Sequence, residues 1–208
     1  MSLPADNEHS IALYKSHAAH YDKSARFTMP LRRRTIALLN LRPGEVVLDV
    51  GAGTGLSYAL LLDGVGESGR VLAFEQSPDM FALAQDRVSR HAWKNVWQVN
   101  MSAETVELPE QADAVLFNYV HDISRNPHAV ANILRQVKPG ARIAMAGMKF
   151  FPWWTGPLNL LAWYKNRPYN APPGDLWHPW DKVASYCDRF EWHATQWGMG
   201  YIGSGIKR

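Results

Sequence analysis

The sequence predicts an α/β fold: a mostly parallel sheet of seven strands with helices on both faces, an antiparallel C-terminal hairpin and an N-terminal helical cap. Three observations favour this class. Five short apolar runs alternate with segments of helical spacing, short turns join them, and two final apolar runs flank Gly198 and Gly200 like a hairpin. A chain of 208 residues is long enough to cover both faces of such a sheet within one domain.

The first predicted strand and its turn organise the rest of the chain. The strand spans 46–50, and its short, β-branched, unalternated run is typical of a buried parallel strand. Three alternating glycines, Gly51, Gly53 and Gly55, lead into an apolar helix that begins at 56. Glycine permits positive φ and leaves no Cβ in the way of a ligand. We therefore expect a nucleotide-type site at this turn.

The spacing of the glycines distinguishes between ligands. A dinucleotide site has the pattern G-x-G-x-x-G, whereas this turn reads G-x-G-x-G, with Leu56 where the third glycine would stand. Asp49, just ahead of the glycines, would repel a pyrophosphate but suits a ligand with an ammonium group and no phosphate. S-Adenosylmethionine is such a ligand. The next strand, 71–74, ends in Glu75, which is placed to accept hydrogen bonds from both ribose hydroxyls.

Asp49 and the three glycines resemble motif I of the class I S-adenosylmethionine-dependent methyltransferases. The resemblance runs from about residue 14 to the end of the chain. It implies a Rossmann-like fold, S-adenosylmethionine as cofactor, and Ala52 within the turn as one of its contacts. Within the class, the runs 41–44, 121–122 and 138–140 look most like the UbiE and phospholipid N-methyltransferase-like group, whose members act on quinone precursors, lipid headgroup amines and small molecules.

The resemblance implies further contacts with the adenine. Gln76 and Met80 would flank the ring, although a methionine on a helix face is also ordinary core. Members of the class often place an acid and then a small residue after the third strand. Here Ser102 precedes Ala103 instead, which leaves the serine hydroxyl or the Ala103 N–H to meet the adenine edge, with Glu104 as the alternative in a shifted register.

Candidates for the methyl-transfer step lie after the fourth strand and near the N-terminus. Ligands gather beyond the carboxyl ends of parallel strands, so Asn118 is expected to contact the cofactor there. His121, beside Asp122, is the candidate base because an unperturbed histidine titrates near neutral pH; the alternative is a histidine that orders the loop. Related enzymes carry a tyrosine near the methyl group, and Tyr14 and Tyr21 are the matching residues, or else helix-packing aromatics.

The remaining elements follow from periodicity and capping residues. Ser77-Pro78 and Asn126-Pro127 are typical helix starts, and the run 138–140 reads as a turn. We expect helices over 31–39, 80–91, 128–137 and 180–188, and strands over 95–99, 113–117, 141–147, 190–197 and 201–207. One domain would then comprise a helical cap (1–40), a cofactor-binding core (41–147), an insert rich in tryptophan and proline (148–180) and a closing helix and hairpin (181–208).

Composition and charge narrow the classes of partner. The net charge of +3 is mild, and the basic cluster Arg32-Arg33-Arg34 reads as the solvated face of a helix, or alternatively as a contact for phosphate or lipid. A single cysteine, Cys187, excludes an internal disulfide and reads as core within a helix, and no metal site is expected. The polar first ten residues and the lack of a long apolar run predict a cytoplasmic protein, with peripheral membrane contact left open.

The sequence therefore predicts an S-adenosylmethionine-dependent methyltransferase that acts on a small molecule or lipid headgroup, at nitrogen or oxygen. The tryptophan-rich insert is either a lid over the substrate or packing against the sheet. A cofactor-binding module without turnover is the alternative from another class. A nucleic-acid methyltransferase is disfavoured because the run 118–121 lacks an Asn-Pro-Pro-Tyr-type tetrapeptide, and a dehydrogenase ranks last.

Overall fold

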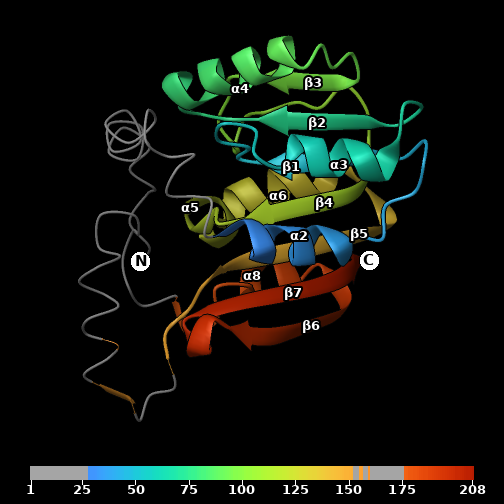
Figure 1. Cartoon of the computed structure of the whole chain (residues 1–208). Helices are drawn as coiled ribbons and strands as arrows, with labels where there is room; N and C mark the ends of the chain where they lie inside the picture. The colour runs from blue at the N-terminus through green and yellow to red at the C-terminus, as the bar shows by residue number, and fades with distance from the viewer. Residues whose placement is uncertain (1–27, 152–154, 157–158, 160–175) are drawn as a thin grey trace.

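A single seven-stranded sheet, ordered β3-β2-β1-β4-β5-β7-β6, forms the centre of the molecule (Figure 1). The computed structural model describes residues 28–151, 155–156, 159 and 176–208. The strands are β1 (Val46–Val50), β2 (Arg70–Phe74), β3 (Val96–Val99), β4 (Ala112–Asn118), β5 (Val137–Met148), β6 (Cys187–Thr195) and β7 (Gly200–Lys207). β1 to β5 run parallel, whereas β7 pairs antiparallel with β5 and β6. The predicted α/β class and C-terminal hairpin are confirmed.

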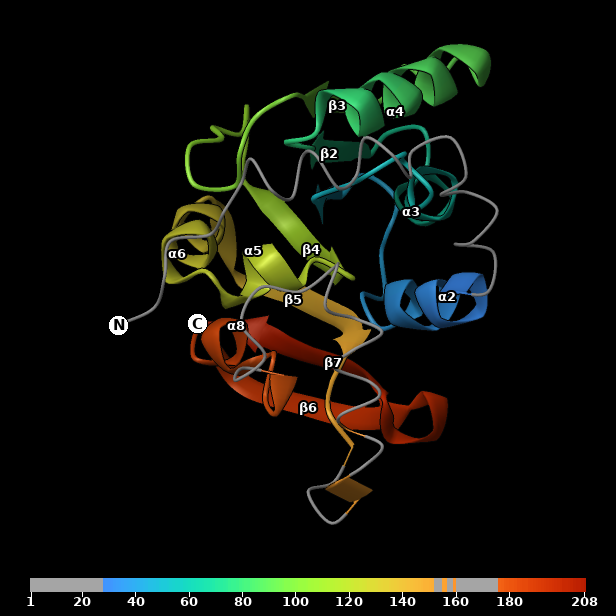
Figure 2. The ribbon, with the colours of Figure 1, turned by 90° about the vertical axis from the view of Figure 1, so that its left-hand side faces the viewer.

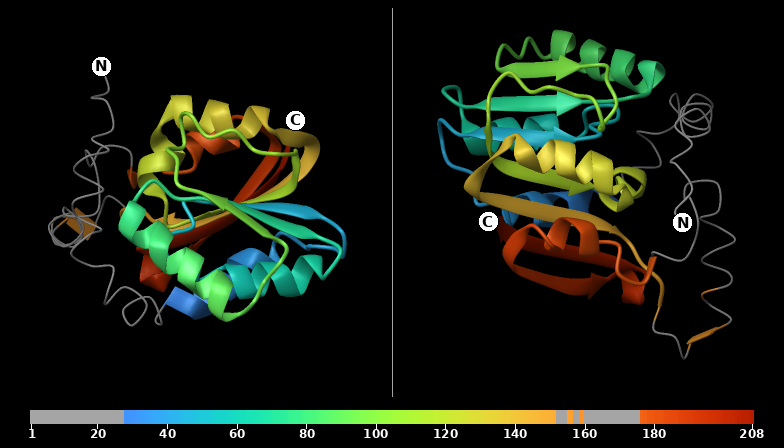
Figure 3. Two further views of the ribbon diagram at one scale, coloured as in Figure 1. Left: turned by 90° about the horizontal axis from the view of Figure 1, so that it is seen from above. Right: turned by 180° about the vertical axis from the view of Figure 1, so that it is seen from behind.

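Helices cover both faces of the sheet (Figure 3). One face carries α2 (Met29–Ala37), α3 (Tyr58–Val65) and α4 (Pro78–Arg90), and the other carries α5 (His121–Arg125), α6 (Pro127–Arg135) and α8 (Asp181–Ala184). The two helix starts predicted from sequence are confirmed. Ser77 Oγ accepts from the Met80 N–H at 3.4 Å, and Asn126 Oδ1 accepts from the His128 N–H at 2.9 Å.

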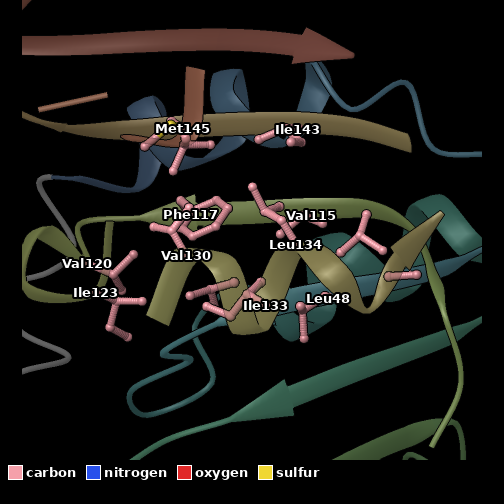
Figure 4. Packing of buried hydrophobic residues seen from close by; sticks show 14 of the residues in the cluster. Leu48, Val115, Phe117, Val120, Ile123, Val130, Ile133, Leu134, Ile143 and Met145 are labelled. Atoms are coloured by element: carbon pink, nitrogen blue, oxygen red, sulfur yellow. The ribbon is translucent and has the colours of Figure 1, made fainter. Parts of the chain in front are cut away.

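The sheet separates two apolar cores. On the α3 face, Tyr58 and Leu61 pack with Val47 and Leu116. On the α6 face, the core includes the labelled residues of Figure 4, such as Phe117, Val130, Ile133 and Met145. Because the parallel strands are buried on both sides, β1 and β4 read as nearly continuous apolar runs rather than alternating ones.

Three local expectations are wrong. The segment after β4 is a helix, α5, where a loop was expected. The run 138–140 lies inside β5, within the register shift against β4, so it interrupts the pairing of the strand and is not a separate turn. Cys187 begins β6, paired with Lys207, because α8 ends at Ala184; the thiol is still buried in the core as expected. For Cys187, pairing with the distant strand β7 overrides the local pattern.

The aromatic residues at the end of the insert divide between core and surface. Trp180 is buried and stacks on Trp192, with ring centroids 4.2 Å apart, whereas Trp177 is exposed. Trp180 therefore packs against the sheet. The N-terminal cap before residue 28 and most of the insert lie outside the described residues. Within the described ranges, no helix has the length and apolarity needed to cross a bilayer.

Candidate functional site

A cavity opens at the carboxyl ends of β1, β2 and β4, the edge that faces the viewer in Figure 2. β1 lies between β2 and β4, where the strand order reverses, and this is where ligands bind in open α/β sheets. Nine of the ten residues predicted to hold the cofactor line the cavity: Asp49, Gly51, Ala52, Gly53, Glu75, Gln76, Met80, Ala103 and Asn118. Other lining residues were not predicted from the sequence, among them Arg32, Thr54, Phe74, Tyr119 and Val120.

The glycine turn after β1 serves both packing and access. Gly51 has φ +57°, and a Cβ there would lie 2.9 Å from the side chains of Val120 and Ile123, so the glycine lets the turn pack against α5. Gly53 has φ +60°, and a Cβ would meet no atom of the described chain within 4 Å. The backbone is therefore exposed to the cavity at Gly53, as a turn that admits a ligand requires.

Glu75 is fixed at the end of β2 by two backbone groups. Its Oε2 accepts from the Gly53 N–H at 2.9 Å and its Oε1 from the Ser77 N–H at 2.8 Å. Burial raises the pKa of the Glu75 carboxyl, and these two N–H groups oppose that rise. Each carboxylate oxygen can accept a second hydrogen bond. The residue is therefore held in place and still able to accept two hydroxyls from the cavity.

Asp49 is a buried acid with an unused oxygen. Its residue exposure is 2%, and its Oδ2 has no hydrogen-bond partner among the described residues. Burial raises the pKa of Asp49 to about 7, while nearby Arg32 and a hydrogen bond from the Ser57 hydroxyl act to lower it. A carboxylate in this position is complementary to an ammonium group, because a cation in the cavity would satisfy the oxygen and favour its ionised form.

The position of Arg32 shows that the basic cluster 32–34 is only in part the solvated face of a helix. Arg33 and Arg34 are exposed as expected, but Arg32 is buried, at 6% exposure, and lines the cavity. The reason is helical geometry: Leu31, Arg32, Thr35 and Ile36 form the buried face of α2. Of the three consecutive arginines, two therefore face solvent and one faces the cavity. Composition alone does not distinguish them.

The loop after β3 is anchored to α6. The buried Asn132 side chain donates to the carbonyls of Ala103 and Val106, at 2.9 and 3.0 Å. This places Ala103 in the cavity wall, which Met80 of α4 also lines. Ser102 is not among the lining residues; its hydroxyl lies 3.3 Å from that of Thr105. Of the two candidates for the adenine edge, Ala103 is therefore the one at the cavity.

The contacts of His121 disfavour its prediction as the base. Its Nε2 accepts from the Met148 N–H at 2.9 Å, so the neutral ring carries its proton on Nδ1. Burial lowers the pKa of His121 to about 4, helped by Arg125. His121 is not among the cavity-lining residues, whereas its neighbour Asp122 is. Tyr14 and Tyr21 lie outside the described residues.

The cavity fits the predicted cofactor. Asp49 and Glu75 lie at the ends of adjacent parallel strands, and the open backbone at Gly53 lies beside them. The unused Asp49 oxygen suits an ammonium group, and the anchored Glu75 suits a pair of ribose hydroxyls. Met80, buried on α4, and the Ala103 loop provide the remaining walls for a flat base.

Comparisons with known proteins agree with this geometry. Residues 47–140 match the family described as "Methyltransferase domain". The chain is 31% identical over 112 residues to protein-L-isoaspartate O-methyltransferase from Aeropyrum pernix, and 34% identical over 118 residues to the ubiquinone/menaquinone biosynthesis C-methyltransferase UbiE from Azotobacter vinelandii. Each alignment covers 54% of this chain, and 42% and 46% of those relatives, so the chain spans about half the length of the curated relatives it matches.

Solved structures share the fold. A SAM-dependent methyltransferase from Aquifex aeolicus superposes with a TM-score of 0.71 at 21% identity, covering 93% of this chain and 98% of that one. The N-methyltransferase NodS from Bradyrhizobium japonicum, in complex with S-adenosyl-L-homocysteine, superposes with a TM-score of 0.63 at 13% identity, covering 86% of both chains. Residues 47–140 therefore match a methyltransferase domain, and the fold is shared with S-adenosylmethionine-dependent methyltransferases, which supports S-adenosylmethionine as the cofactor.

Proposed function

We propose that the protein transfers a methyl group from S-adenosylmethionine to a nitrogen or oxygen atom of a small molecule or lipid headgroup. One observation carries the proposal: two buried carboxylates, Asp49 and Glu75, flank an open glycine turn at the reversal point of the sheet. The cofactor supplies an electrophilic methyl group on a positively charged sulfur. The task left to the protein is to align two reactants and to exclude water.

Each wall of the cavity has a part in that alignment. Glu75 accepts the ribose hydroxyls, and Asp49 holds the ammonium group. Met80 and Gln76 contact the base from the start of α4, while Ala103 bounds its edge. With both ends of the cofactor held, the direction of the sulfur–methyl bond is fixed, and an in-line approach is open to a correctly placed acceptor.

The acceptor approaches from the side formed by the end of β4. Tyr119 and Val120 line this side, and Asp122 brings the nearest carboxylate of that segment to the cavity. Burial raises the pKa of Asp122, which brings it closer to the range in which a carboxylate accepts a proton at neutral pH. An amine acceptor needs a proton acceptor only after the methyl group has been transferred. A hydroxyl acceptor needs one during the methyl transfer itself. Asp122 therefore replaces His121 as the proposed proton acceptor.

The choice of substrate class rests on similarity. The relatives include UbiE and a demethylmenaquinone methyltransferase from Symbiobacterium thermophilum, which is 27% identical over 158 residues and aligns with 66% of this chain and 63% of its own length. Their names indicate quinone precursors. The isoaspartate relative indicates a protein carboxylate as a second acceptor type. The UbiE-like subgroup, the cytoplasmic location and the four-part division of the chain remain predictions.

Two measurements test the proposal in sequence. Isothermal titration calorimetry with S-adenosylhomocysteine should show one site, and Asp49→Asn with Glu75→Gln should abolish it. Consumption of S-adenosylmethionine is then measured with amines, phenols, quinone precursors, phospholipids, isoaspartyl peptides and RNA. Binding with no turnover across this panel would favour the non-catalytic module, and turnover with RNA would favour the nucleic-acid enzyme. No binding of S-adenosylhomocysteine would refute the assignment of the cavity.

A further inference from the structure

The turn between β6 and β7 holds the most exposed large apolar side chain of the described residues. This turn is η5 (Gln196–Gly198), and Trp197 within it is 99% exposed. The other exposed large apolar side chains in the described ranges reach only 37–43%. An indole is among the side chains that gain most from burial, so one left almost wholly in water indicates contact with a partner.

The backbone of the turn holds Trp197 in this position at a conformational cost. Gln196 has φ +50° and Trp197 has φ +58°, in the left-handed region that residues with a Cβ rarely adopt. The turn is anchored on both sides. The Gln196 side chain donates to the Tyr119 hydroxyl at 3.3 Å, and the Lys149 N–H donates to the Met199 carbonyl at 2.8 Å. Glycine would suit the backbone at Trp197 better, so folding of the hairpin does not account for the indole.

Three aromatic residues continue the apolar surface of the turn, and with Trp197 they form what we call the aromatic edge: Phe150, Phe151 and Trp177. Phe151 packs beside the turn, because a Cβ on Gly198 would lie 3.5 Å from its ring. Phe150, the next residue along the chain, makes an edge-to-face contact with the exposed Trp177, with ring centroids 5.3 Å apart. Trp197 is therefore part of a continuous aromatic surface.

The aromatic edge lies at the same end of the sheet as the cavity. Met148 ends β5 and pairs with Gly200, which begins β7, so the turn before Gly200 lies at the carboxyl ends of the parallel strands (Figures 1 and 2). The run 195–200 contains no acid, Lys149 is bonded to it through the backbone, and the whole chain has a net charge of +3. These charges are complementary to an anionic surface.

We propose that the aromatic edge rests on an anionic lipid bilayer, with the indole of Trp197 among the lipid headgroups. An indole suits that region because it combines an apolar ring with an N–H donor. The cavity then opens toward the membrane, and its acceptor is a molecule held in the bilayer. This inference rests on the proposed function and selects, from its small molecules and lipid headgroups, the acceptors that are embedded in lipid.

Vesicle flotation measures the proposed contact directly. Vesicles of phosphatidylcholine and phosphatidylglycerol in about a 2:1 ratio give an anionic surface, and phosphatidylcholine alone gives a neutral one. The wild-type protein should float with the anionic vesicles. Trp197→Gly should bind them at least about 10-fold more weakly, because the buried indole is lost. Its Tm should not fall, because glycine relieves the left-handed backbone. Lys149→Gln should weaken binding to the anionic vesicles by about fivefold and to the neutral ones much less.

The far end of β7 supplies a matched control. Ile206 is 43% exposed and pairs with Arg142, near the start of β5, so it lies at the opposite end of the sheet. Ile206→Ala should leave vesicle binding unchanged. Trp197→Phe keeps an aromatic ring in the turn and should retain most of the binding. Brominated phosphatidylcholine in the anionic vesicles should quench the tryptophan fluorescence of the wild-type protein more than that of Trp197→Phe.

Four results would overturn the inference while leaving the proposed function intact. These are a wild-type protein that does not float with the anionic vesicles, a Trp197→Gly variant that floats as well as wild type, an Ile206→Ala variant that binds as weakly as Trp197→Gly, and equal quenching of wild type and Trp197→Phe. Calorimetry with S-adenosylhomocysteine in the absence of vesicles reports on the cofactor cavity separately. Failure of the wild-type protein to bind S-adenosylhomocysteine would refute the proposed function itself.

Discussion

Asp49→Asn is expected to stabilise the ligand-free protein, and to do so increasingly as the pH rises. The pKa of Asp49 rises from 3.8 to about 7 on folding because the carboxyl is buried. Below pH 3.8 the group is protonated in both states and has no effect. Above that value the unfolded chain releases the proton while the folded chain retains it, so stability falls with rising pH until the folded group also ionises, above about pH 7. Asparagine has no such dependence.

The size of the effect follows from the same shift. A tenfold change in proton affinity is worth about 1.4 kcal/mol, so the full loss is on the order of 4 kcal/mol for a pKa that moves from 3.8 to about 7. About 2 kcal/mol of it falls between about pH 5.5 and about pH 8. Urea unfolding followed by tryptophan fluorescence at these two pH values should show the advantage of Asp49→Asn growing by that amount.

The exposed acid Asp63 on α3 supplies the control. Asp63→Asn should change stability equally at both pH values, because the exposed side chain stays in water when the chain folds and pays no cost of burial. Two results would refute the role of burial. One is a gain in the free energy of unfolding of Asp49→Asn that is the same at both pH values, and the other is a variant less stable than wild type at about pH 8. The stabilised variant should also lose affinity for S-adenosylhomocysteine, since the destabilising charge is the one that the ligand requires.

Three further predictions follow from the site. Glu75→Gln should weaken S-adenosylhomocysteine binding by about 10- to 100-fold in calorimetry, because it removes a charged acceptor; an unchanged Kd would exclude Glu75 as the ribose contact. His121→Ala should lower the free energy of unfolding by about 1 to 3 kcal/mol, because it leaves the Met148 N–H unpaired. Turnover at saturating cofactor should be unchanged. A folded variant with a reduced kcat would restore His121 as the candidate base. Gly51→Ala should destabilise the folded protein by about 2 kcal/mol more than Gly140→Ala in urea unfolding. Both glycines have positive φ, but only at Gly51 would the added Cβ lie 2.9 Å from neighbouring side chains. Equal losses of stability would contradict this role of Gly51 in packing.

The cofactor half of the site was predictable because its signals are local. A strand end, an acid and spaced glycines lie within a few residues of one another, and Glu75 follows directly from the next strand. Parallel strands bring such ends together whatever the rest of the chain does. Nine of ten predicted contacts therefore line the cavity.

The remaining residues depend on long-range packing, which the local pattern does not contain. Arg32 and Arg33 are neighbouring arginines, and only the packing of α2 against the sheet places Arg32 in the cavity wall. His121 carries a typical catalytic side chain, but the strand β5 supplies the Met148 N–H that occupies it. Helix α5 was missed for a different reason, because five residues give too little periodicity to reveal a helix.

The cavity is bounded by elements from both layers of the molecule. Arg32 reaches it from α2 on one face, while Val120 and Ile123 reach it from the segment beneath the other. A ligand that fills this cavity would contact helices on both faces of the sheet at once. It would therefore link two helical layers that are otherwise connected through the sheet. We therefore expect occupancy to raise the melting temperature and to slow amide hydrogen exchange in α2 and α5 together, more than in the distant β6–β7 hairpin.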